Sequence, residues 1–364
     1  MLDIRVKRLA SLLVNYCLDV KPNENILITG SVASAQLIQE VYREVLKKGA
    51  FPRTKVTLPS LEKIFLDEAS MEQLKYLSSI DKYEVENSDG VINILSTDNT
   101  KSLSNVDSSK IAILTKSRDP LKKIILQKDR WVLTLFPTLA YAQDAEMSLD
   151  EFEDFVYNGC YVNKEDPIAY WKKLHDEQQR LIDYLKGKER VRIIGEDTDI
   201  TFSIKDRVFI NSDGHRNMPS GEIFTGPQED SVNGFIRFSY PVCTQGKEIE
   251  DIRLKFKDGK VVEAKASKNE DFLRNMLEID EGAKRIGEFG IGTNFGIKKF
   301  IKNILFDEKI GGTIHLALGS SYPETGGKVI SALHWDMIKD LRSGGKVIVD
   351  DEIIMQDGKL KFIT

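Results

Sequence analysis

The chain has 364 residues, of which 41% are hydrophobic and 30% are charged. This length allows two or three domains, and the composition is that of an ordinary folded protein rather than a disordered or fibrous one. Because 52 Lys and Arg stand against 57 Asp and Glu, the net charge is −5 and no strongly basic field exists to collect nucleic acid. We therefore expect no nucleic-acid partner.

The N-terminal segment and the cysteines bear on the location of the protein in the cell. Charges interrupt the apolar residues of segment 1–20 well short of a membrane span, and the segment does not have the form of a signal peptide. Cys17, Cys160 and Cys243 form no C-x-x-C pair, which suggests neither a zinc knuckle nor a disulfide framework. We expect a cytoplasmic protein without a membrane segment.

Strand-like and helix-like segments alternate in the first half of the chain. A strand over 25–30 and a helix over 33–49 form a first βα unit, because Leu37, Val41 and Val45 fall on one helical face. Further strands are predicted for the short apolar runs 90–95, 110–114 and 131–136. This alternation is typical of an α/β domain with a mainly parallel sheet.

Two helices and a polar run end this half. Ser148 and Glu151 form an S-x-x-E capping box ahead of a helix, and a longer helix is predicted from about Asp166 to Leu185. The polar run 186–190 is typical of a boundary between domains. We therefore expect an N-terminal α/β domain over 1–186 and a C-terminal domain over 187–364.

Period-two alternation replaces the βα pattern after this boundary. Strands are predicted for 190–195, 199–204 and 234–240, and a hairpin for 252–257 and 260–264, joined by Asp258-Gly259. Helices are expected near 270–277 and 296–304. The second domain is thus predicted to be an α+β domain rich in antiparallel strands.

Histidines are rare in this chain, so the neighbours of each one are informative. His175, in a polar helix, is predicted to be a surface residue, and His215, in a turn-like polar stretch, is predicted to be a loop histidine, with an approach to a site as the alternative. An alternating pattern places His315 on a face that it shares with neither Ile314 nor Leu316. His334 and Asp336, two residues apart, fall on the same side of an extended segment. An imidazole beside a carboxylate suits zinc, cobalt or manganese, although a hydrogen-bonded structural pair fits the same spacing.

Three glutamates add to the candidate ligands. Glu222 lies in a frame of Gly and Pro residues, Glu288 lies between Gly287 and further glycines, and Glu308 shortly precedes His315. The glycines around Glu288 lack the context of a phosphate-binding loop. Close backbone approach around a buried acid explains them better.

Several segments taken together resemble the aminopeptidase T / aminopeptidase S family of metallopeptidases. They occur in the family's order and are Asn217–Pro227, Gly287–Asn294, Leu305–Lys309, His315–Gly319 and Leu333–Ile338. The segment that begins at Lys21 also resembles the α/β domain of that family. The resemblance covers essentially the whole chain.

The resemblance implies a site with two divalent metal ions, zinc, cobalt or manganese, that removes N-terminal residues from peptides. When the family's residues are carried over one by one, the resemblance implies six metal ligands: Glu222, Glu288, Glu308, His315, His334 and Asp336. It also implies that Glu288 bridges both ions and that Tyr322 lies beside them, which makes these two the candidate catalytic residues. A homodimer, in which the N-terminal domain helps to enclose the site, is implied as well.

This set of ligands fits two-metal hydrolysis. Four carboxylates and two imidazoles can hold two dications, which lower the pKa of a shared water while one ion binds the α-amine of a peptide. A carboxylate would carry the proton to the leaving amine, and Tyr322 would donate a hydrogen bond to the oxyanion, unless it is only a core or rim tyrosine. The sequence lacks the H-E-x-x-H and G-x-S-x-G motifs of other hydrolases. Two alternatives stay open: a dinuclear hydrolase of another amide or ester, and a non-catalytic binding protein on the same fold.

Overall fold

The computed structural model describes residues 3–244 and 247–363. Within them the chain forms two compact units: residues 3–168 with Gly214–Pro219, and Ala169–Asp213 with residues 220–363. The boundary after Lys186 stays a prediction. In the described part of the chain, no helix combines the length and the apolar character needed to cross a membrane.

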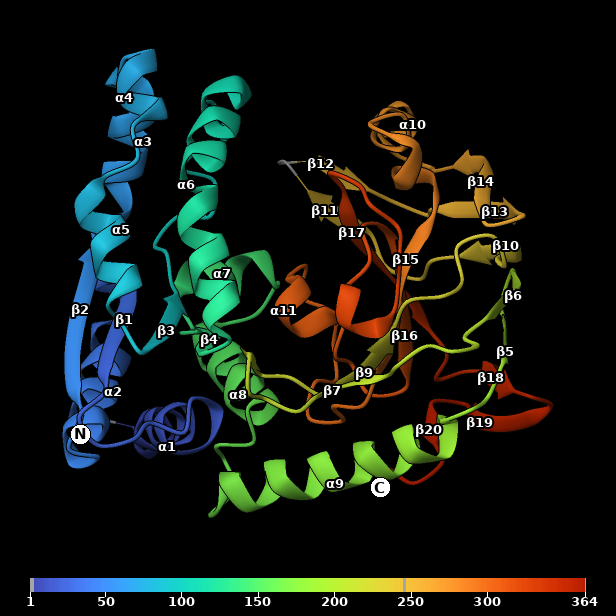
Figure 1. The fold of residues 1–364 in the computed structure, drawn as a ribbon, viewed down its shortest axis with the longest axis horizontal. Coiled ribbons are helices and arrows are strands. Elements are labelled where there is room, and N and C mark those ends of the chain that lie inside the picture. The colour runs from blue at the N-terminus through green and yellow to red at the C-terminus, as the bar shows by residue number, and fades with distance from the viewer. Residues whose placement is uncertain (1–2, 245–246, 364) are drawn as a thin grey trace. The chain divides into compact units, whose positions relative to one another are not determined.

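The first unit is built on a parallel sheet of five strands in the order β2-β1-β3-β4-β8 (Figure 1). The strands are β1 (Asn25–Ser31), β2 (Phe51–Thr57), β3 (Gly90–Leu95), β4 (Trp131–Leu135) and β8 (Asn217–Met218). β1, β3 and β4 are mostly buried, as expected for strands that are covered on both faces. The mainly parallel sheet expected from the sequence is confirmed.

Helices cover both faces of this sheet. On one face Leu27 and Val91 pack against Val85 of α5 and against Ile124 and Ile125 of α6. On the other face α2 packs on β1. The helical segments of the unit are α1 (Ile4–Leu12), η1 (Leu13–Cys17), η2 (Val32–Ser34), α2 (Ala35–Lys47), α3 (Pro59–Glu68), α4 (Met71–Lys75), α5 (Ser79–Glu86), α6 (Ser108–Lys128), α7 (Leu139–Asp144) and α8 (Leu149–Gly159).

One prediction in this unit is wrong and another is confirmed. The run 110–114 is expected to be a strand but lies inside α6. This helix begins after Asp107, and the Asp107 side chain caps it by accepting a hydrogen bond from the Ser109 N–H. Leu114 packs in a separate apolar cluster with Leu66 and Leu74, so the apolar residues of the run serve one helix face. The capping box at the start of α8 is present as predicted.

The second unit consists largely of antiparallel strands. An eight-stranded sheet has the order β14-β13-β10-β6-β5-β18-β19-β20, and a five-stranded sheet has the order β17-β16-β15-β9-β7. The strands of the larger sheet are β5 (Arg190–Gly195), β6 (Thr198–Ser203), β10 (Asn233–Arg237), β13 (Arg253–Lys257), β14 (Lys260–Lys265), β18 (Lys346–Val349), β19 (Glu352–Gln356) and β20 (Lys359–Leu360). Those of the smaller sheet are β7 (Ile210–Ser212), β9 (Glu222–Thr225), β15 (Ile286–Gly292), β16 (Thr313–Gly319) and β17 (His334–Asp340).

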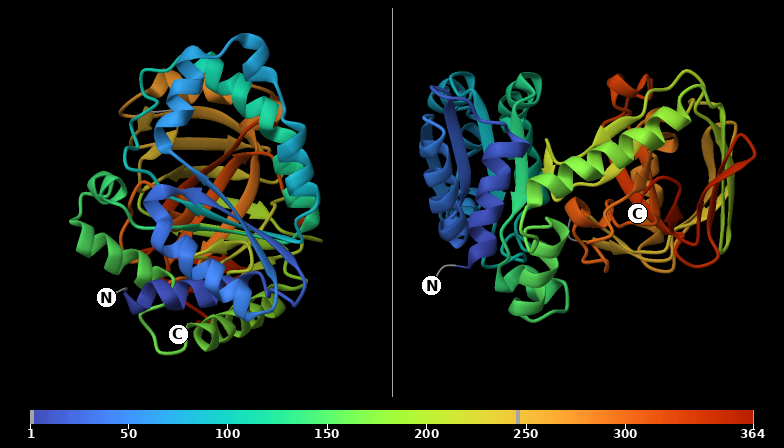
Figure 2. Two further views of the ribbon diagram at one scale, coloured as in Figure 1. Left: turned by 90° about the vertical axis from the view of Figure 1, so that its left-hand side faces the viewer. Right: turned by 90° about the horizontal axis from the view of Figure 1, so that it is seen from below.

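Apolar side chains join these two sheets. Phe202 of β6 meets Phe289 of β15 edge to face, with 5.0 Å between the ring centroids. The remaining elements are α9 (Pro167–Leu185), β11 (Val242–Thr244), β12 (Lys247–Ile249), α10 (Glu270–Leu277), η3 (Glu281–Lys284), α11 (Ile304–Asp307) and η4 (Pro323–Thr325). Helix α9 passes along the strands of this unit (Figures 1 and 2). The predicted fold class, an α/β domain followed by a domain of antiparallel strands, is confirmed.

The helix expected over 296–304 is absent. The only helical residues there are those of the short α11, which begins at Ile304. The buried carboxylate of Asp307 accepts hydrogen bonds from the N–H groups of Ile301 (2.8 Å) and Asn303 (2.6 Å). These bonds satisfy the backbone of a loop, and the loop replaces the predicted helix.

Candidate metal centre

The predicted site residues lie on one face of the smaller sheet. Because side chains alternate along a strand, Phe289 of β15 and Leu316 of β16 point toward the larger sheet, and their neighbours point away from it. The neighbours include predicted site residues, which are Glu222 on β9, Glu288 on β15, His315 on β16, and His334 and Asp336 on β17. The register of four strands therefore brings five of the predicted residues to one face.

Small residues lie between these side chains and leave room for them. Ala317 stands between Glu288 and Asp336 in the ladder, and Gly290 stands opposite His315. A Cβ atom on Gly290 would lie 2.0 Å from the His315 ring. The glycines around Glu288 thus permit close approach, as the sequence indicates.

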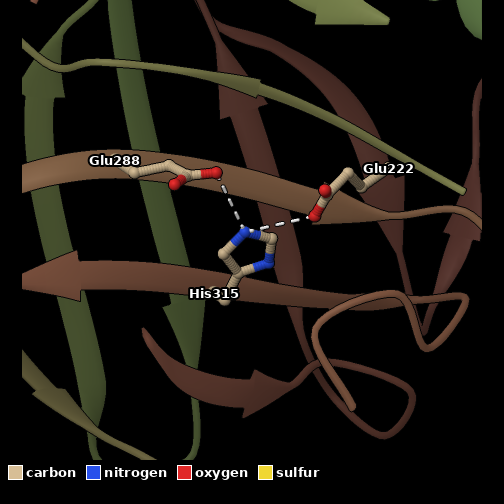
Figure 3. A group of neighbouring side chains, drawn as sticks. All are labelled: Glu222, Glu288 and His315. Carbon is tan, nitrogen blue, oxygen red and sulfur yellow. Dashed lines mark hydrogen bonds and ion pairs between the residues drawn. The ribbon is translucent and has the colours of Figure 1, made fainter. Parts of the chain in front are cut away.

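Glu222, Glu288 and His315 form a first buried group (Figure 3). The Nε2 atom of His315 lies 3.4 Å from Glu222 Oε2 and 3.4 Å from Glu288 Oε1. All three side chains are at most 6% exposed. Three potential ligand atoms therefore converge in a region shielded from solvent.

Glu288, His334 and Asp336 form a second group. The Nε2 atom of His334 lies 3.2 Å from Glu288 Oε2 and 3.7 Å from Asp336 Oδ2. The Nδ1 atom of the same ring lies 2.9 Å from the carbonyl oxygen of Ser320, which can only accept a hydrogen bond. Nδ1 therefore carries a proton, and Nε2 is directed at the carboxylates.

The pKa values of the residues in both groups differ from those of isolated residues. Burial alone would lower the pKa of His315, but Glu288 and Glu222 outweigh it and raise the pKa to about 9. For His334, burial is outweighed by Glu288 and Asp336, and the pKa rises to about 10. Burial raises the pKa of Glu222 to about 7 and that of Asp336 to about 6. Glu288 is the exception, because its hydrogen bonds to both imidazoles outweigh burial and lower its pKa to about 2.

A fully buried lysine adjoins the first group, and the sequence analysis missed it. The Nζ atom of Lys309 lies 2.9 Å from Glu222 Oε1 and is in closer contact with Glu308 Oε1. Despite burial, the two carboxylates raise the pKa of Lys309 above its usual range. Glu308 itself belongs to neither group. The structure therefore brings the sixth predicted ligand to the edge of the cluster, where it is paired with a lysine.

Tyr322 lies beside the second group. Its ring stands edge-on to His334, with 5.1 Å between centroids, and the residue is 40% exposed. Burial and the nearby carboxylates raise the pKa of the Tyr322 hydroxyl well above its usual range. The hydroxyl therefore keeps its proton near neutral pH.

The other two histidines lie apart from this cluster. His175 pairs with Asp213, with 2.6 Å between Nδ1 and Oδ2, and its side chain is 42% exposed, as a surface histidine should be. His215 packs against Tyr16, with 4.6 Å between ring centroids.

Unpartnered polar atoms show that the cluster suits a cation. Among the described residues, Glu222 Oε2, His315 Nδ1 and Asp336 Oδ1 are buried without a hydrogen-bond partner. Buried polar atoms normally form a hydrogen bond, so each buried atom without one needs an explanation. Ligand atoms arranged tetrahedrally at about 2.1 Å from a zinc ion lie about 3.4 Å apart, as His315 Nε2 does from its two carboxylate oxygens. The residues therefore fit a divalent metal, as the site of a metal-dependent enzyme requires.

Comparison with known proteins identifies the family. A family model described as thermophilic metalloprotease (M29) matches residues 2–360, so the chain belongs to that family. It is 26% identical to aminopeptidase 2 of Geobacillus stearothermophilus, over 86% of this chain and 83% of that protein. It is 25% identical to aminopeptidase AmpS of Bacillus subtilis, over 98% and 93% respectively. The structure of wild-type AmpT from Thermus thermophilus superposes with a TM-score of 0.85 over 98% of each chain at 20% identity, which establishes the shared fold.

Proposed function

We propose that the cluster holds two divalent ions and that Glu288 is their shared ligand. One observation carries this proposal: the two oxygens of Glu288 face different groups, Oε1 toward His315 and Oε2 toward His334. A carboxylate with one oxygen directed at each group is suited to bridging two ions. Glu222 and His315 would complete one side, His334 and Asp336 the other, and Glu308 would be the remaining ligand.

The chain is a metal-dependent aminopeptidase. Its family consists of metalloproteases, and the relatives that match along most of its length are named aminopeptidases. Its substrates are therefore peptides, and we propose that they are short peptides with a free N-terminus. The proposed metal site supports this proposal, because a bound divalent ion would accept a free α-amine as a ligand, whereas an acylated amine would not serve.

The proposed chemistry assigns a task to each group of side chains. When bound, divalent ions supply Lewis acidity, which lowers the pKa of a water molecule and polarises a carbonyl group. Tyr322 keeps its hydroxyl proton and is placed beside His334, which supports a role as hydrogen-bond donor to the oxyanion of the peptide carbonyl. The contribution of Glu288 is to fix both imidazoles relative to each other. The carboxylates of the cluster are the groups within reach of the proton that must pass to the leaving amine.

Other features of the proposal are supported by the sequence alone. The family resemblance supports zinc, cobalt or manganese as the ions and supports the homodimer. The N-terminal segment and the cysteines support the cytoplasmic location, and the polar run 186–190 supports the domain boundary after Lys186. Nitrogen and oxygen ligands suit all three metals.

Hydrolysis of paired substrates tests the proposed function. Leucine p-nitroanilide should be cleaved by the metal-loaded protein, and N-acetyl-leucine p-nitroanilide should not, because acetylation removes the α-amine. Cleavage of both substrates at similar rates would favour a hydrolase of other amides or esters. Cleavage of neither, by a protein with its full metal content, would favour a non-catalytic binding protein.

A further inference from the structure

The side chains of the cluster differ in their exposure to solvent. The side chains of Glu222, Glu288 and His315 are at most 6% exposed, and that of Asp336 is 12% exposed. Exposure rises to 29% for the side chain of His334 and to 40% for Tyr322. His334 and Tyr322 therefore lie on the side of the cluster that is more open to solvent.

A second aromatic residue lines this open side. Phe224 follows Glu222 by two positions on β9, so both side chains lie on the same face of the sheet. Its ring is partly exposed and lies 5.3 Å from the ring of Tyr322, at an angle of 58°. Tyr322 in turn meets His334 at 5.1 Å. Phe224, Tyr322 and His334 therefore form a continuous row of rings on this more exposed side of the cluster.

Phe224 and Tyr322 differ chemically from the cluster beside them. The cluster consists of carboxylates and imidazoles, whereas Phe224 offers only apolar surface and Tyr322 offers a ring with a single hydroxyl. Partly exposed rings beside a polar site are typical of a surface that receives an apolar group of a ligand. On a peptide held by its α-amine, the nearest such group is the side chain of the first residue.

We propose that Phe224, together with the Tyr322 ring, forms the subsite that receives the N-terminal side chain and selects large apolar and aromatic residues. This inference rests on the proposed aminopeptidase function. Phe224 is then a specificity-determining residue that acts on the substrate by contact. Its removal should affect substrates according to the size of their first side chain.

The test compares Phe224→Ala with wild type on the p-nitroanilides of leucine, phenylalanine and alanine. We expect kcat/KM for leucine and phenylalanine to fall at least 10-fold, since an apolar pocket discriminates by about 10-fold to 200-fold. The value for alanine should stay within threefold. Phe235→Ala serves as the matched control, because Phe235 is 49% exposed on β10 of the other sheet, and it should leave all three values unchanged.

Metal content and melting temperature are measured on each variant to separate specificity from folding. Phe224→Leu provides the same test if Phe224→Ala does not fold, and it should lower the value for phenylalanine more than that for alanine. An equal loss on all substrates, or no loss on any, would overturn the inference while the aminopeptidase function stands. A wild type that cleaves none of the three would instead overturn the proposed function, and this inference with it.

Discussion

Replacement of Lys309 by methionine removes the buried ammonium group that contacts both Glu222 and Glu308. Methionine keeps an unbranched chain of similar length but leaves the two carboxylates without this partner. At an effective dielectric constant of about 20, the 2.9 Å contact with Glu222 is worth about 6 kcal/mol of attraction. Lysine also loses hydration when it is buried, so the net cost is smaller. Breaking one partner of a buried ion pair typically costs about 3–5 kcal/mol, which is the loss of unfolding free energy that we expect.

Lys339→Met is the matched control for this prediction. Lys339 is also buried, at 2% exposure, but it lies on the other face of β17, where its Nζ donates a 2.7 Å hydrogen bond to the carbonyl oxygen of Glu196. Its removal strands no charge and should cost about 1 kcal/mol. Urea unfolding of both variants in the presence of a chelator measures the two losses. A Lys309→Met protein that is destabilised no more than Lys339→Met would refute the assigned role of the buried ion pair.

Three further predictions concern the cluster itself. Gly290→Ala should weaken metal binding at least 10-fold in chelator competition, because the new Cβ would displace the His315 ring; unchanged binding would show that the close approach is unimportant. Metal binding should release about two protons at pH 8, because pKa values of about 9 and 10 keep His315 and His334 protonated until a metal displaces the protons. The number should rise to between three and four at pH 6, because Glu222, with a pKa of about 7, becomes protonated and Asp336, with a pKa of about 6, becomes half protonated. Calorimetry in buffers of different ionisation enthalpy counts these protons, and none released would contradict the assignment. Tyr322→Phe should lower kcat by about 100-fold at unchanged metal content, and near-normal kcat would remove the tyrosine from the mechanism.

Local patterns in the sequence were sufficient for much of this site. The period-two alternation around His315 correctly separates it from Ile314 and Leu316, and the H-x-D spacing correctly places His334 beside Asp336. Both inferences depend only on the geometry of a single strand. The joining of these strands into one cluster depends instead on the register between β9, β15, β16 and β17. Spacing along the chain does not encode that register, and only the family resemblance suggested it.

The errors also have physical causes. The run 110–114 is too short for periodicity to separate a strand from a buried helix face, and its contact with Leu66 and Leu74 decides for the helix. Lys309 follows Asp307 and Glu308 in a charged tripeptide, which gives no sign that two of the three residues are almost wholly buried. Only the fold reveals that its ammonium group faces Glu222.

The central claim is that Glu288 joins two metal ions in a working aminopeptidase. The most direct measurement combines metal content with hydrolysis of leucine p-nitroanilide, on wild type and Glu288→Gln, after chelation and after re-addition of zinc, cobalt or manganese. We predict about two ions per chain and restored activity in the wild type, with loss of both in the variant. A wild type that binds no metal, or hydrolysis that survives both chelation and the substitution, would contradict the claim.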